Sequence, residues 1–133
     1  MFGIKKQPPI HTLVGEGTVI KGELLFSAGL RIDGEVVGDV TASGERSILV
    51  ISEKARVCGK VKAGHVIING TVQGPVEATE LLELQPKARI QGDVRYEALE
   101  MHQGATIEGG LHPLHPLKAE EQPAVIKLAS NNA

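Results

Sequence analysis

Short segments in which apolar and polar residues alternate recur along most of this chain. The two clearest are residues 30–40, LRIDGEVVGDV, and residues 66–76, VIINGTVQGPV, which share the same order of apolar residues, spacers and glycines, with Gly34 matching Gly70. Because successive side chains of a strand point to opposite faces, alternation of this kind predicts short β-strands with one apolar face.

Shorter copies of the same sequence motif occur along the chain at a nearly regular spacing. They occupy residues 20–24, 57–61, 90–94 and 107–111. One glycine can be taken from each unit: Gly22, Gly38, Gly59, Gly74, Gly92 and Gly109. These glycines are about 17 residues apart, a period that is typical of solenoids built from stacked repeats. The sequence therefore predicts a single repeat array of about six coils.

The alternation also assigns each residue to a face of its coil. The apolar residues and the glycines, such as Ile32, Gly34 and Val36, point inward, while the spacers between them point to solvent. Nearly all of the spacers are polar: Lys21, Glu23, Asp33, Glu35, Asn69, Thr71, Gln73, Pro75, Gln91 and Asp93. An inward glycine leaves room for a bend or for backbone angles that other residues avoid, so we expect corners at the glycines.

Two kinds of segment interrupt the strands. A small residue precedes several copies of the motif, and we expect Ala55, Ala88 and Ala105 to point inward at corners. The polar residues 41–47 make one repeat longer than the others, and they are predicted to form a loop that bulges from one coil.

Composition supports one small β-domain without a nucleic-acid partner. The chain has 133 residues, 41% of them hydrophobic and only 2% aromatic, which suits a narrow interior filled by Val, Ile and Leu. A net charge of −2, without aromatic residues interleaved among basic ones, argues against nucleic-acid binding. A single cysteine rules out an internal disulfide framework, and there is no apolar run of about 18 residues. We therefore expect a cytoplasmic protein.

No constellation of catalytic or cofactor-binding residues is visible. Residues 12–22 contain several glycines but lack the spacing of a nucleotide-binding loop, so no nucleotide is expected. Cys58 falls on an outward spacer and should be a partly exposed free thiol. His112 and His115 have a chelating spacing but no further ligands of the right type nearby, so no metal site is predicted. The acidic residues are interpreted as a solvated face: Asp33, Glu35, Asp39 and Asp93.

The two ends of the chain depart from the repeat. We expect residues 1–11 to form a disordered leader and the proline-containing residues 113–133 a disordered tail. A second interpretation of the leader is a membrane-targeting segment, whose apolar side chains enter the membrane interface while its lysines meet anionic lipid. Its residues would be Met1, Phe2, Ile4, Lys5 and Lys6. One copy would bind weakly, whereas many copies on a polymer would bind through avidity.

A solenoid of strands has two open ends at which strand edges and the apolar interior are unprotected, and such edges promote association. Neither terminal segment offers an obvious amphipathic cap, so the sequence predicts end-to-end polymerisation. The expected contacts are Leu13, Val14, Ile20, Leu24 and Phe26 at one end and Ile107 and Leu111 at the other.

Several of these motifs together resemble the bactofilin family. They are Met1-Phe2-Gly3 followed by lysines, TLVGEGT at 12–18, GLRIDG at 29–34, and the Ala-Arg-Val/Ile-x-Gly phrase at 55–59 and 88–92. The resemblance covers about residues 1–112 and implies a right-handed parallel β-helix over residues 12–112 with disordered ends. It also implies nucleotide-independent filaments without polarity that serve as a bacterial cytoskeletal scaffold. Such scaffolds often lie at the inner face of the cytoplasmic membrane and localise cell-wall synthesis, cell-wall hydrolysis or cell-shape proteins, and the family's membrane-targeting leader corresponds to the five leader residues named above.

Two alternatives remain open. Left-handed β-helix acyltransferases have coils of similar length, and apolar residues six apart occur here, for example at Val14, Ile20 and Phe26. However, their hexapeptide pattern favours a small residue after the apolar one, which this chain lacks, and only His65 and His102 could supply a catalytic base. We therefore expect no enzyme and no cofactor. The second alternative is a monomeric β-helix that presents a face to protein partners.

Overall fold

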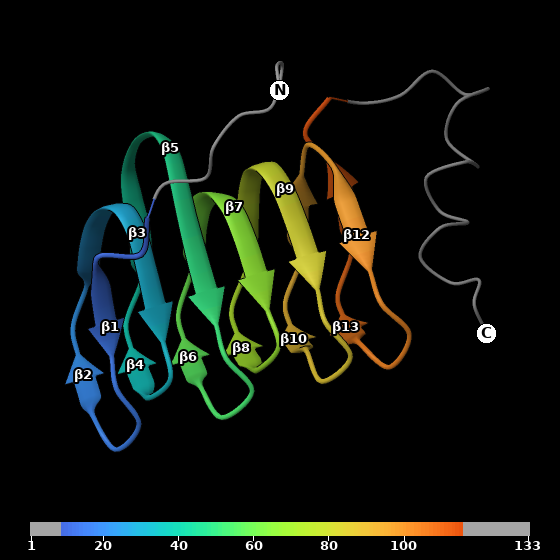
Figure 1. The fold of residues 1–133 in the computed structure, drawn as a ribbon. Helices are drawn as coiled ribbons and strands as arrows, with labels where there is room; N and C mark the ends of the chain where they lie inside the picture. The colour runs from blue at the N-terminus through green and yellow to red at the C-terminus, as the bar shows by residue number, and fades with distance from the viewer. Residues whose placement is uncertain (1–8, 116–133) are drawn as a thin grey trace, which may run out of the picture.

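The computed structural model describes residues 9–115, which form β-strands and no helix. All strand pairings are parallel, and the strands form two sheets that run along a stack of coils (Figure 1). The second sheet has six strands, one for each coil. The predicted fold class is thus confirmed as an all-β, parallel β-solenoid of about six coils. None of the described residues belongs to a helix with the length and apolar character needed to cross a membrane.

The strands are divided between the sheets as follows. The first sheet contains β1 (Thr12–Val14), β3 (Leu24–Ile32), β5 (Val40–Ile51), β7 (Val61–Ile68), β9 (Val76–Leu84), β11 (Val94–Tyr96), β12 (Leu99–Met101) and β14 (Leu111–Pro113). The second contains β2 (Val19–Lys21), β4 (Glu35–Val37), β6 (Arg56–Cys58), β8 (Thr71–Gln73), β10 (Arg89–Gln91) and β13 (Thr106–Glu108). Strands that occupy equivalent positions in successive coils lie side by side.

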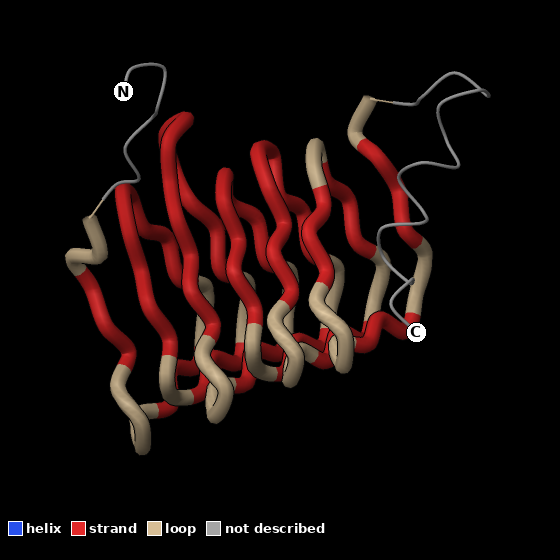
Figure 2. Tube along the Cα trace, turned by 45° about the vertical axis from the view of Figure 1, so that its right-hand side comes forward, coloured by secondary structure: helices blue, strands red, loops and turns tan. Residues whose placement is uncertain are grey.

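A typical coil consists of the second half of one long strand of the first sheet, a corner, one short strand of the second sheet, a second corner and the first half of the next long strand. The first coil therefore runs from β1 to the start of β3, and the last coil runs from β12 to β14. The corner loops line up along the stack in Figure 2. The register shows that coils differ in length: Arg56 pairs with Thr71, whereas Val40 pairs with Val61, so the coil that contains residues 41–47 is several residues longer. Coils of such unequal length do not keep the fixed hexapeptide spacing of the acyltransferase alternative.

Branched aliphatic side chains from successive coils stack in columns inside the solenoid. One column comes from the middle residue of each strand of the second sheet: Ile20, Val36, Val57, Val72, Ile90 and Ile107. The four inner members are buried, and the two end members are partly buried and pack against them. Burial of each such side chain stabilises the fold by roughly 1.5–3 kcal/mol. The inward face predicted from the alternation is therefore the core.

The corner that follows the long strand has two forms. Four-residue turns occupy residues 15–18, 52–55, 85–88 and 102–105, and each is closed by a backbone hydrogen bond from its last N–H to its first carbonyl. Two-residue corners contain Gly34 or Gly70 and nest against the four-residue turn of the preceding coil. A Cβ atom on Gly70 would lie 2.2 Å from the carbonyl oxygen of Ser52, so only glycine fits there. The two forms alternate over the first four coils, so each of these coils resembles the coil two positions away more than its direct neighbour. This explains why the clearest sequence match, between residues 30–40 and residues 66–76, joins segments that are two coils apart.

Ala55 and Ala88, which close two of the four-residue turns, are buried, and Ala105 is partly buried. The predicted inward alanines at corners are thus confirmed.

The opposite corner is a column of stacked glycines. The φ angles of Gly38, Gly59, Gly74 and Gly92 lie between 149° and 153°. A Cβ atom on any of them would approach the carbonyl oxygen of the glycine one coil earlier; for Gly59 the distance to the Gly38 oxygen would be 2.2 Å. The corners that the sequence places at these glycines are therefore confirmed, and the close approach of backbone to backbone explains the residue type.

Three of the acidic spacers make structural hydrogen bonds instead of forming only a solvated face. Asp39 accepts the backbone N–H of Lys60 at 2.9 Å, and Asp93 accepts that of Gly110 at 2.8 Å, each one coil further on. Hydrogen bonds from Ser52 and from Arg31 hold the pKa of Asp33 below its usual value. The carboxylates therefore help to set the spacing between coils.

The prediction for residues 41–47 is wrong in one respect. They belong to β5 instead of forming a separate loop, and the register of β5 against β7 shifts between Thr41 and Ile48. The strand carries its extra residues as an irregularity, so the coil is longer, as expected, and β5 rises above its neighbours in Figure 1.

Candidate functional site: the open ends of the solenoid

The two ends of the stack carry strand edges without a neighbour. Within residues 9–115, β1 pairs only with β3, and β2 pairs only with β4. At the other end β12, β13 and β14 each pair only with a strand of the preceding coil. The backbone groups on their outer sides can therefore bond to another chain, which is how exposed sheet edges associate.

The first coil holds five of the predicted contact residues, in different environments. Leu13 points outward and is exposed, whereas Ile20 and Leu24 point inward and are only partly buried. Val14 and Phe26 are buried. A charge at either of these two positions would therefore perturb folding as well as assembly, which makes them poor positions for testing assembly.

Residues 9–11 approach the first coil. The N–H of His11 donates to the carbonyl of Gly29 at 3.2 Å, and a Cβ atom on Gly29 would lie 2.3 Å from the carbonyl oxygen of Pro9. Of the leader expected over residues 1–11, this part therefore lies against β3. The proposed membrane-targeting residues Met1, Phe2, Ile4, Lys5 and Lys6 lie outside the described residues, as does the tail beyond His115.

The last coil exposes the end of the core. Leu111 is 42% exposed, although Val94, its partner one coil earlier in the same inward column, is 0% exposed. Ile107 is partly buried. Three further residues of this surface, Leu99, Met101 and Ala105, were not among the predicted contacts. The apolar alternation of Leu99 and Met101 is the signal that could have found them.

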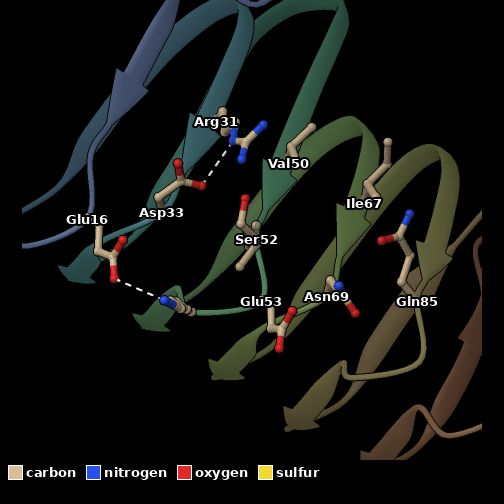
Figure 3. Close-up of a pocket in the computed structure, with 11 residues that line it drawn as sticks. Glu16, Arg31, Asp33, Val50, Ser52, Glu53, Ile67, Asn69 and Gln85 are labelled. Atoms are coloured by element: carbon tan, nitrogen blue, oxygen red, sulfur yellow. Dashed lines mark hydrogen bonds and ion pairs between the residues drawn. The ribbon is translucent and has the colours of Figure 1, made fainter.

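A shallow groove runs along the outer face of the first sheet, where neighbouring strands turn into their corners (Figure 3). Val50 and Ile67 form its apolar part. Its charged groups are paired: Arg31 Nε lies 3.0 Å from Asp33 Oδ1, and Lys54 Nζ lies 3.5 Å from Glu16 Oε2. Glu53 pairs with Lys87 outside the groove, with 2.7 Å between Oε2 and Nζ.

The structure brings together the two histidines of the enzyme alternative. His65 lies on β7 and faces Glu83 on β9, with 3.7 Å between Nε2 and Oε1. His102, just after β12, lies 3.8 Å from the other carboxylate oxygen of Glu83 and 3.4 Å from Glu100. The sequence indicated both histidines as candidate bases, but it did not indicate that they lie around a shared carboxylate, that of Glu83.

The remaining chemical candidates are separate from this cluster. Cys58 is a free thiol of intermediate exposure, as predicted, and its Sγ lies 3.1 Å from Gln73 Oε1. His112 faces Asp93 at 3.7 Å, whereas His115 contacts Glu97. The two histidines thus contact different carboxylates.

A stack of parallel coils whose end strands have no further neighbour within residues 9–115 defines a parallel β-solenoid with open ends. The chain belongs to the bactofilin family: residues 12–112 match this family, which is described as polymer-forming and cytoskeletal. The family resemblance noted in the sequence is thereby confirmed, and with it a structural, cytoskeletal class of protein.

Two relatives come from Myxococcus xanthus (strain DK1622). Bactofilin BacP is 30% identical over 120 residues, which are 88% of this chain and 49% of BacP. Bactofilin BacO is 27% identical over 101 residues, which are 76% of this chain and 78% of BacO. The chain therefore spans about half the length of BacP and most of BacO. No solved structure matches the chain.

Proposed function

We propose that this protein is a cytoskeletal scaffold whose subunits join end to end through their first and last coils, without nucleotide. The observation that carries the proposal is the loss of burial at the end of an otherwise buried column, from Val94 to Leu111. A second subunit stacked there would bury Leu111 and pair the edge strand β14. In a filament without polarity, each joint brings identical ends together, so the first coil meets a first coil and the last coil meets a last coil.

The proposal extends to the place where the scaffold works. Leader residues Met1, Phe2 and Ile4 would enter the inner face of the cytoplasmic membrane, and Lys5 and Lys6 would meet anionic lipid. A polymer presents many leaders at once, so weak individual contacts add up to stable attachment. The sides of the solenoid stay free in an end-to-end filament, and there the scaffold would hold cell-wall synthesis, cell-wall hydrolysis or cell-shape proteins.

Negative-stain electron microscopy of the untagged full-length protein, with EDTA and without nucleotide, tests the polymer. We expect long filaments whose diameter matches one solenoid and whose lengthwise repeat is a multiple of the strand spacing, about 4.8 Å. Compact particles at all salt and protein concentrations would contradict the proposal and favour a monomeric adaptor.

Sedimentation with lipid vesicles tests the membrane contact. Wild-type filaments are expected to pellet with vesicles that contain anionic lipid, and the double variant Lys5→Ala, Lys6→Ala to bind less. Each lysine contributes about 1 kcal/mol near such a surface, so the loss per subunit is roughly 30-fold. Vesicles without anionic lipid are the control. Equal pelleting of both proteins with anionic vesicles would count against a role for the lysines.

A further inference from the structure

Four side chains that could bind a cation gather on the outer face of the first sheet, near the last coil. They are His65 on β7, Glu83 on β9, Glu100 on β12, and His102 directly after β12. The ligand atoms of Glu83, Glu100 and His102 all lie within 4.8 Å of one another. These residues come from three successive coils, so the cluster exists only in the folded stack.

The charges in this cluster are arranged differently from those in another outward column of the same sheet. Glu83 and Glu100 pair directly in register, which places two carboxylates side by side on one face. Like charges in such a position destabilise a sheet. An outward column near the other end of the long strands instead alternates in sign, from Lys62 through Glu77 to Arg95, and there Lys62 Nζ lies 3.8 Å from Glu77.

The contacts of the two carboxylates leave this repulsion in place. Within residues 9–115 their ion-pairing partners are histidines, and Gln85 donates to Glu83 at 3.5 Å. A bound cation would remove the repulsion.

His65 supplies an independent observation. Its side chain is only 10% exposed, and neither of its ring nitrogens has a hydrogen-bond partner within the described part of the chain. Buried polar groups in native proteins are normally paired, so an imidazole in this state needs an explanation. Its Nε2 points at Glu83 Oε1, the oxygen that does not face His102. His65 is therefore placed to hold Glu83 by a hydrogen bond once the carboxylate takes up a fixed orientation.

We propose that Glu83, Glu100 and His102 bind a divalent transition-metal cation of the Zn²⁺ type, with His65 as the residue that positions Glu83. Imidazole and carboxylate are common ligands for zinc, at about 2.0–2.2 Å from the metal. Ligands at that radius in a tetrahedron are about 3.4 Å apart. The His102 Nε2 to Glu100 and Glu83 separations of 3.4 Å and 3.8 Å are close to this value. Water would complete the coordination, because Glu100 and His102 are exposed.

The cation would connect the last coil to the coil before it. Glu83 belongs to β9, and Glu100 and His102 belong to the coil that carries β12. Because the site forms only when these coils are stacked, cation binding would stabilise the folded end of the solenoid. The proposal concerns a single chain and does not depend on polymerisation.

Isothermal titration of the EDTA-treated, dialysed and untagged full-length protein with ZnCl₂ tests the site. The expected result is one ion per chain with a micromolar Kd. His102→Ala and the isosteric Glu100→Gln should each weaken binding at least about tenfold. His112→Ala is the matched control, because His112 also lies in the last coil and faces a single carboxylate. Absence of binding by the wild type, or equal loss in His112→Ala and His102→Ala, would overturn the proposal.

The role of His65 has its own readout. His65→Leu should weaken Zn²⁺ binding about tenfold without lowering the unfolding temperature of the metal-free protein, since it removes an unpaired buried polar group. His65→Gln keeps an N–H donor and should restore most of the affinity. If His65→Gln binds no better than His65→Leu, His65 does not position Glu83.

Discussion

Aspartate at Leu111 is expected to abolish filaments while the solenoid still folds. Leu111 is already 42% exposed on the last strand, so the substituted side chain remains in water in the single subunit. In a joint, the same carboxylate would be enclosed by apolar residues without a partner, which costs several kcal/mol. Each 1.4 kcal/mol changes an association constant tenfold, so the concentration needed for assembly should rise at least about 100-fold.

Val37→Asp is the matched control for this experiment. Val37 is 41% exposed, nearly the same as Leu111, but it lies on β4 in the interior of the stack and points outward. Its charge should remain solvated in a filament. Pelleting assays and negative-stain images would measure assembly, and circular dichroism would measure folding. Filaments of normal length from Leu111→Asp, or equal loss of filaments from Val37→Asp, would contradict assembly through the last coil.

The repeat could be predicted from the sequence because each coil obeys the same local rules. In the motif at residues 30–40, Ile32 and Val36 had to point to one side, and both are buried. The glycine corners followed from the residue type, since a backbone that approaches another backbone excludes a side chain. Position in the repeat, however, does not give the shape of one irregular strand. The extra residues 41–47 looked like a loop, although β5 continues through them.

The end surfaces were predicted less completely than the fold. Order in the chain places Val14 and Phe26 in the first coil, but their burial depends on packing that the alternation does not describe. The cluster around Glu83 shows a related limit. Glu83 and Glu100 are separated by the length of an average coil, so their spacing already indicated that they stack. Because the coils differ in length, this spacing could not be distinguished from several others without the exact register.

Alanine at Gly59 is expected to destabilise the fold severely. The φ angle of Gly59 is +153°, and a Cβ atom would lie 2.2 Å from the oxygen and 2.5 Å from the carbon of the Gly38 carbonyl. These are backbone atoms, so no side-chain rotation relieves the overlap and the coils must separate. The hydrogen bond from Gly38 N–H to Cys58 O, 2.8 Å long, lies at this corner and would weaken. Backbone strain and overpacking together cost roughly 2–6 kcal/mol, a large part of the stability of a typical domain.

Gly22→Ala separates the two causes, because Gly22 occupies the same corner in the first coil. Its φ angle is +133°, but a Cβ atom there has no heavy atom within 4 Å among the described residues, since Gly22 lies in the first coil of that part of the chain. The variant should therefore lose only the strain of the backbone angle, about 1–3 kcal/mol. Urea unfolding in a Leu111→Asp background would measure both variants without a contribution from assembly. Equal losses at Gly22 and Gly59 would show that stacking of the glycines is not the cause.

Gly22→Ala also tests how two subunits meet at their first coils. In the wild-type background, a subunit stacked on the first coil would occupy the space beside Gly22 that Gly38 fills for Gly59. A methyl group at Gly22 should therefore shorten filaments although the single subunit remains folded, and negative-stain images would show the change. Filaments of normal length from folded Gly22→Ala protein would mean that the glycine column does not continue across the joint at the first coil.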